Sequence, residues 1–169
     1  MDDVQGEEAR TCLWNELLQI VRADREDCFD RWRDHGAYLK ERGRRLNELQ
    51  LDSLHFSGPG TDLSVGLSEL ARVEGGGAMS QREVEFVPNL PTEEVFTTPD
   101  WRRTEGVVRV TRPFVVNGEL VRDLTMTFSA GELVDFDASE GAETLKAYVD
   151  SDPGARRLGE VALVGTDSP

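Results

Sequence analysis

The feature that most constrains the fold is a change in the period of the apolar residues near residue 48. Before it, apolar residues recur every three or four positions over about 7–22 and about 24–48, which predicts two helices. After it, the period becomes two, and the turn dipeptide Asn117-Gly118 separates two apolar runs, which predicts strands joined by hairpins. Helices first and an antiparallel meander second predict an α+β fold.

The same change divides the chain into a helical segment, 1–48, and a β-rich segment, 49–169, which we expect to form one structural unit. Two glycines, Gly36 and Gly43, lie on the apolar stripe of the second helix. They lower helix propensity, but they allow another element to approach closely. We expect a short helix over about 140–149 and a final apolar strand over 161–164.

Charge and composition restrict the partners. The 169 residues carry a net charge of −14, which argues against binding to nucleic-acid phosphates or to an anionic membrane. The amino terminus has no signal-peptide pattern, and no window of about 18 apolar residues predicts a membrane span. Cys12 and Cys28 match no zinc or redox spacing, so we expect two thiols in a reducing cytoplasm.

Two glutamates stand in stretches that normally exclude a charge. Glu94 lies in the segment Pro91-Thr92-Glu93-Glu94-Val95-Phe96, and Glu160 directly precedes the apolar run 161–164. An ionised carboxylate in such a place needs a cation or strong hydrogen-bond donors beside it. Hard divalent ions favour carboxylate oxygen. The two glutamates therefore suggest a shared divalent metal site.

Other roles for these carboxylates stay open. If the first segment is extended, Glu93 and Glu94 point to opposite faces, and one of them faces outward. The alternative is that both belong to a solvated turn. Glu160 has the alternative of an ion pair with Arg156 or Arg157, which precede it closely.

The remaining polar residues give no catalytic set. His35 lies on the stripe of the second helix and His55 in a predicted strand, and both are interpreted as packed or surface histidines. The segment 58–63 is a glycine-proline turn that opens a strand, and it lacks the lysine and glycine spacing of a phosphate-binding loop. Catalytic residues therefore stay unassigned, and we expect no organic cofactor.

Five stretches together resemble the thermophilic-type metallo-aminopeptidases, the group of aminopeptidase T, aminopeptidase S and PepS. They occur in the family's order, from about residue 26 to the last residue. The stretches are Leu46-Asn47-Glu48-Leu49, Gly58-Pro59-Gly60-Thr61-Asp62-Leu63, Phe86-Val87-Pro88-Asn89-Leu90-Pro91-Thr92-Glu93-Glu94-Val95-Phe96-Thr97, Arg103-Thr104-Glu105-Gly106-Val107-Val108, and Asp152-Pro153-Gly154-Ala155-Arg156-Arg157-Leu158-Gly159-Glu160-Val161-Ala162-Leu163-Val164.

The resemblance implies a cytoplasmic, homodimeric enzyme that releases amino-terminal residues from peptides with two divalent metal ions, of zinc, cobalt or magnesium. It implies that Glu94 and Glu160 are metal ligands. Together with the alternation of a strand, it predicts that Glu94, and not Glu93, faces the interior alongside Glu160. The family's other ligands, two histidines and an aspartate, lie further along the family chain than residue 169. The resemblance thus implies part of a larger catalytic domain, truncated at both ends relative to the family and inactive by itself.

A second hypothesis comes from a different class of protein. The chain could be a non-catalytic α+β module that binds a partner or dimerises through its exposed sheet. Distal histidine ligands would separate the two hypotheses, because only the enzyme requires them.

Overall fold

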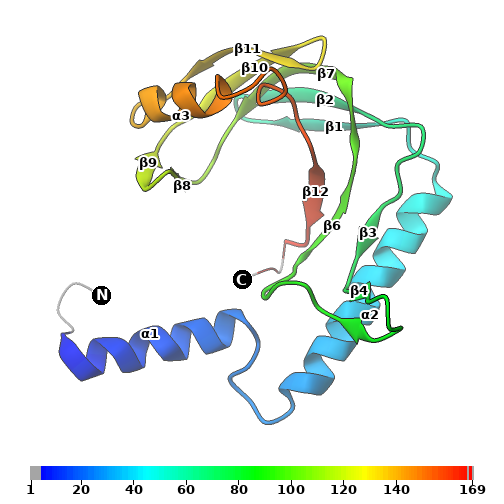
Figure 1. Cartoon of the computed structure of the whole chain (residues 1–169), viewed down its shortest axis with the longest axis vertical. Coiled ribbons are helices and arrows are strands. Elements are labelled where there is room, and N and C mark those ends of the chain that lie inside the picture. The colour runs from blue at the N-terminus through cyan, green and yellow to red at the C-terminus, as the bar shows by residue number, and fades with distance from the viewer. Residues whose placement is uncertain (1–4, 167, 169) are drawn as a thin grey trace. The chain divides into compact units, whose positions relative to one another are not determined.

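The helices and strands of the computed structural model, which describes residues 5–166 and 168, are drawn in Figure 1. The chain divides into two compact units. Unit 1 comprises Met1–Glu48, Val73–Phe96 and Ala162–Pro169. Unit 2 comprises Leu49–Arg72 and Thr97–Val161. Helices come first and antiparallel strands follow, so the predicted α+β class is confirmed.

Unit 1 contains the two predicted helices, α1 (Gly6–Ile20) and α2 (Cys28–Glu48). The second begins later than the apolar period suggested, because the chain turns between them. Arg22 adopts a left-handed φ of +53°, and the turn is held by an Arg31–Asp24 hydrogen bond of 2.8 Å. That bond is the main reason why the pKa of Asp24 lies below its usual value.

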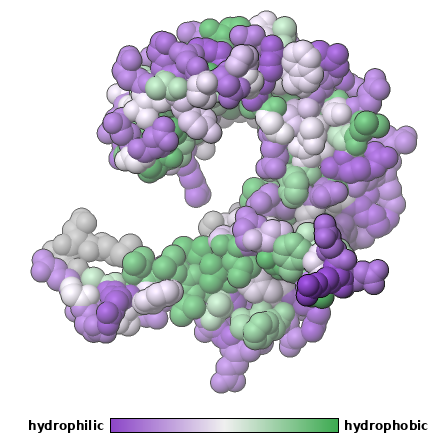
Figure 2. Space-filling view, viewed as in Figure 1, coloured by the Kyte–Doolittle hydropathy of each residue, from purple (hydrophilic) through white to green (hydrophobic). Residues whose placement is uncertain are grey.

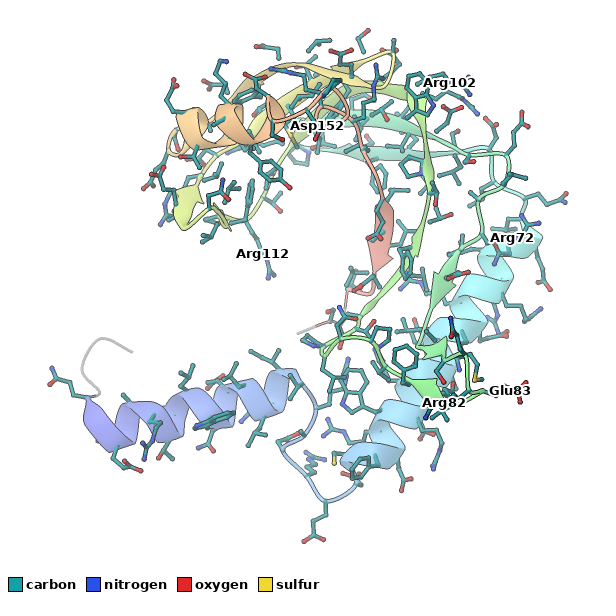
Figure 3. The ribbon with its side chains drawn as sticks, in the orientation of Figure 1. Arg72, Arg82, Glu83, Arg102, Arg112 and Asp152 are labelled. Carbon is teal, nitrogen blue, oxygen red and sulfur yellow. The ribbon has the colours of Figure 1, made fainter. Side chains whose placement is uncertain are left out.

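Short strands complete unit 1. A three-stranded sheet has the order β12 (Val161–Val164), β6 (Glu94–Thr97), β3 (Glu74–Gly75). A separate pair, β4 (Ala78–Met79) and β5 (Glu85–Phe86), is joined by a turn that carries Arg82 and Glu83 (Figure 3).

The segment before β3 is fastened to the end of α2. The Asn47 side chain donates to the Val73 carbonyl (2.9 Å) and accepts from the Val73 N–H (2.8 Å). The Asn47 side chain thus makes both backbone hydrogen bonds of Val73, as a neighbouring strand would. Antiparallel pairing of Gly75 with Val95 then joins β3 to β6.

Glycines let α2 and the 73–76 segment meet backbone to backbone. A Cβ added at Gly43 would lie 3.1 Å from the Val73 carbonyl oxygen, and one at Gly36 would lie 3.1 Å from the Gly76 carbonyl oxygen. A Cβ at Gly76 would lie 2.1 Å from the Gly36 carbonyl oxygen. The prediction that the two helix glycines admit a close neighbour is confirmed.

Unit 2 is built on a five-stranded antiparallel sheet. Its strand order is β1 (Ser53–Gly58), β2 (Thr61–Leu67), β7 (Pro99–Arg109), β10 (Thr125–Ser129), β11 (Glu132–Asp137). The predicted Asn117-Gly118 turn joins β8 (Phe114–Val116) to β9 (Glu119–Val121), with left-handed φ angles of +50° and +84°. The predicted third helix is α3 (Ala142–Val149).

The period of two that begins after residue 48 predicts a strand directly after the second helix, but the first strand begins only at Ser53. Leu49 is 65% exposed, and Gln50 adopts a left-handed φ of +49° just after α2. A left-handed residue of this kind typically ends a helix. The alternating apolar residues therefore belong to a strand only from Ser53 onward.

The core of unit 2 lies between the sheet, α3 and the β9 segment. Alternate residues of β2 point into it, as expected for a strand with one buried face. The buried members are Leu63, Val65, Leu67, Val121, Leu124, Phe128, Leu133, Leu145, Val149 and Val161. Among the described residues, no helix is both long and apolar enough to cross a membrane.

Substitution of Gly76 should be far more damaging than substitution of Gly118. Both have positive φ, so alanine costs about 1 kcal/mol of backbone strain at either site. At Gly118 no atom lies within 4 Å of the new Cβ, whereas at Gly76 it overlaps the Gly36 carbonyl. We expect Gly76→Ala to lower the free energy of unfolding by about 3 kcal/mol or more. Equal losses in urea titrations of the two variants would refute the close contact.

Candidate functional site

Glu94 is the first residue of β6, and its side chain is half-buried. Its Oε2 accepts a hydrogen bond from the backbone N–H of Glu93 at 3.2 Å. The neighbours Thr92 and Val95 are buried, with 8% and 1% exposure. The Glu94 carboxylate therefore extends from a part of the chain that is held in place on both sides.

Glu160 is exposed and directly precedes β12. The two arginines expected as alternative partners bond elsewhere, so that alternative is wrong. Arg156 pairs with Asp150, and Arg157 pairs with Glu132 at 3.2 Å. Both arginines also donate to backbone carbonyls of unit 2, and this fixes them away from Glu160.

Glu93 makes the contacts that the sequence did not predict. Its side chain is 11% exposed, and its Oε2 accepts a hydrogen bond from Arg22 Nη2 at 2.6 Å. His35 Nε2 lies 3.4 Å from the same oxygen. The prediction that Glu94, and not Glu93, faces the interior is therefore wrong for Glu93, which is enclosed, whereas Glu94 is half-buried. Because β6 begins only at Glu94, the alternation of a strand does not extend to Glu93.

The histidine and the arginine are themselves held by aromatic and backbone groups. His35 Nε2 lies 2.9 Å from the Thr92 carbonyl oxygen, and the His35 ring meets the Trp32 ring edge-on, with centroids 5.6 Å apart. Trp32 Nε1 donates to the Val21 carbonyl at 2.7 Å, next to Arg22. The interpretation of His35 as a packed histidine is confirmed.

A cavity of about 280 Å³ borders this cluster within unit 1. It is lined by Arg22, His35, Tyr38, Arg42, Glu93, Gly165 and Ser168. Three buried polar atoms lack a hydrogen-bond partner among the residues that the structure describes: Arg22 Nε, Arg42 Nη1 and Glu93 Oε1. The cavity is thus a polar space rather than an apolar ligand pocket.

The donor atoms of Glu94 and Glu160 suit a divalent metal in chemical type, because carboxylate oxygens bind hard cations. Within residues 5–166 and 168, no group of three or more histidine, cysteine, aspartate or glutamate side chains could hold an ion. Each carboxylate is thus of a residue type that metal ligand sets use, and its assignment as a ligand stays a prediction. Glu94 belongs to unit 1 and Glu160 to unit 2.

The residues that sequence reasoning missed are Arg22 and the inward Glu93. The only local signal was the position of His35, one turn from Trp32 and Leu39 on the buried stripe of α2. Such a histidine must find a polar partner when it is buried. Nothing in the sequence near residue 22 identifies that partner.

Comparison with known families shows the class of protein, a metalloprotease. The family model described as thermophilic metalloprotease (M29) matches residues 1–169, and the chain belongs to this family. The resemblance inferred from the five sequence stretches is thereby confirmed.

Individual relatives agree. Aminopeptidase T of Thermus aquaticus is 47% identical over 163 residues, which is 96% of this chain and 40% of that protein. Aminopeptidase PepS of Streptococcus thermophilus is 42% identical over the same shares. The structure of wild-type AmpT from Thermus thermophilus matches with a TM-score of 0.91 and 42% identity, over 100% of this chain and 41% of that one. The chain thus spans about 40% of the length of its relatives.

One further structure shares the fold alone. The 2,5-dihydroxypyridine dioxygenase of Pseudomonas putida KT2440 matches with a TM-score of 0.56 at 18% identity, over 94% of this chain and 47% of that one. At this identity the similarity supports the architecture and says nothing about the chemistry.

Removal of the Arg22 side-chain charge should destabilise unit 1. In Arg22→Met, Glu93 stays enclosed without its counter-ion, and loss of one partner of a buried pair typically costs about 3–5 kcal/mol. The matched control is Lys40→Met, which breaks the exposed Lys40–Glu85 pair and should cost about 0.5 kcal/mol or less. Urea unfolding of both variants measures the difference. Similar losses would show that Glu93 is solvated.

Proposed function

We propose that the whole protein containing this span is a metal-dependent aminopeptidase that releases amino-terminal residues from peptides. The observation that carries the proposal is the match over the full chain to AmpT, at a TM-score of 0.91 and 42% identity. Because the span covers about 40% of its relatives, the activity belongs to the whole protein in this proposal.

Within that enzyme, Glu94 and Glu160 are the proposed metal ligands of this span. The proposed cofactor is a pair of divalent ions, of zinc, cobalt or magnesium. When bound, such ions would supply Lewis-acid chemistry for peptide-bond hydrolysis. The contribution of this chain is to present carboxylate oxygens from a fixed backbone, and the Glu93 N–H orients one of the Glu94 oxygens.

The remaining partner proposals follow from charge, cysteines and surface. We expect neither nucleic acid nor an anionic membrane as partner, because the net charge is −14. Cys12 and Cys28 are free thiols, which supports a reducing compartment such as the cytoplasm.

The proposed oligomer is a homodimer, and α1 carries the observation that supports it. Apolar side chains gather along this helix (Figure 2). They are Leu13, Trp14, Leu17, Leu18 and Ile20, with exposures between 37% and 58%. An apolar face of this kind is typical of a protein contact surface. It is also the one observation that favours the alternative of a non-catalytic binding or dimerisation module.

Glu94→Gln and Glu160→Gln test the ligand assignment. In the protein expressed from its complete reading frame, each should lower kcat/KM for leucine p-nitroanilide by more than the roughly 10–100-fold typical of losing a residue that only supports a ligand. A chelator should abolish hydrolysis, and zinc, cobalt or magnesium should restore it in the parent protein. Glu85→Gln, which removes an exposed carboxylate of unit 1, is the control and should leave the rate unchanged. Full activity of either ligand variant would refute its assignment.

Leu17→Glu tests the dimer. A charge on the apolar face of α1 should shift the protein from dimer to monomer in sedimentation equilibrium, because an unpaired charge is costly in a protein contact. Asn15→Glu adds the same charge to the same helix at an exposed polar position and should leave the mass unchanged. An unaltered mass in Leu17→Glu would exclude α1 from the interface.

A further inference from the structure

Two independent contacts fix the chain just before Glu94. Arg22 holds the Glu93 carboxylate at 2.6 Å, and His35 reaches the Thr92 carbonyl at 2.9 Å. A carbonyl oxygen only accepts, so His35 must carry its proton on Nε2 and donate it there. The Glu93 oxygen bonded by Arg22 lies 3.4 Å from the same nitrogen. Side chain and backbone are thus held by residues from the α1–α2 turn and from α2.

The next link runs from this fixed backbone to the Glu94 carboxylate. The Glu93 N–H donates to Glu94 Oε2 at 3.2 Å. On the other side, Val95 is 1% exposed and pairs with Gly75 of β3. Glu94 therefore lies between two immobilised residues, and one of its oxygens is oriented by the first of them.

A gain in folding stability does not by itself explain the enclosed Arg22–Glu93 ion pair. An enclosed ion pair loses much of its Coulombic gain to desolvation, and apolar residues of similar size are often equally stabilising. Here Glu93 Oε1 is also buried without a partner among the described residues, which adds cost. Charged groups of this kind are typical beside metal ligands, which they hold in the orientation that binding requires.

We propose that Glu93, with Arg22 and His35, is a positioning residue that holds the Glu94 carboxylate ready for a divalent metal ion. This inference rests on the proposed function, because it takes Glu94 as a ligand. Glu93 itself touches neither metal nor substrate in this proposal. Its effect passes through the Glu93 N–H and the backbone between residues 92 and 94.

The test is a double-mutant cycle read out as zinc affinity. Zn²⁺ is titrated into the protein from its complete reading frame in competition with a chromophoric chelator, for Glu93→Gln, Glu94→Gln and the double variant. Glu93→Gln should weaken binding by roughly 10–100-fold. In the Glu94→Gln background it should add less than about 2-fold, because residues that act through one another are not additive. A purely structural role predicts an undiminished effect there.

Two further variants keep the test decisive if Glu93→Gln folds poorly. His35→Gln retains an N–H donor near the Thr92 carbonyl and should bind zinc like the parent, whereas His35→Leu should bind about 10-fold more weakly. Glu85→Gln is the charge-matched control and should leave the affinity unchanged. Parent-like affinity of both Glu93→Gln and His35→Leu would overturn the positioning role.

The outcomes separate this inference from the function on which it rests. Parent-like zinc affinity of Glu94→Gln would overturn the ligand assignment in the proposed function, and the positioning role with it. Weak binding by Glu94→Gln with normal binding by Glu93→Gln would overturn the positioning role alone.

Discussion

The close contact between α2 and the segment 73–76 is the constraint on which unit 1 depends. Gly36 and Gly76 approach so closely that a single added carbon would overlap a carbonyl oxygen. This contact fixes β3 against the helix, and β3 in turn pairs with β6. The glutamate pair at the start of β6 is thereby held beside a helix that supplies His35. Gly36 and Gly43 of α2 thus help to set the position of the Glu93 and Glu94 carboxylates.

Charge placement follows from this packing. Once Glu93 is enclosed, its ionised form needs a counter-ion, and Arg22 supplies it from a left-handed turn after α1. A left-handed φ is costly for a residue other than glycine, so the surrounding contacts must hold it. Exposed pairs such as Lys40–Glu85 share the chemistry but are largely solvated. The enclosed pair is therefore the one that can orient its neighbours.

Family membership and the described structure address different questions. The match over residues 1–169 assigns the chain to the thermophilic metalloproteases, and the relatives are named aminopeptidases. The chain spans about 40% of those relatives, so it contributes a part of their architecture. The local geometry adds what the family name does not contain, namely which groups surround Glu93 and Glu94.

Patterns local in sequence determined the elements of this protein. Helical spacing predicted α1 and α2, Asn117-Gly118 predicted its hairpin, and the α2 glycines predicted a close neighbour, because each property depends on residues a few positions apart. Only tertiary structure decided that Glu93 faces inward. Its ion pair joins residues 71 positions apart, and no local period records such a contact. Whether a charged side chain such as Glu93 is buried depends on the groups that the tertiary structure places next to it, here Arg22 and His35.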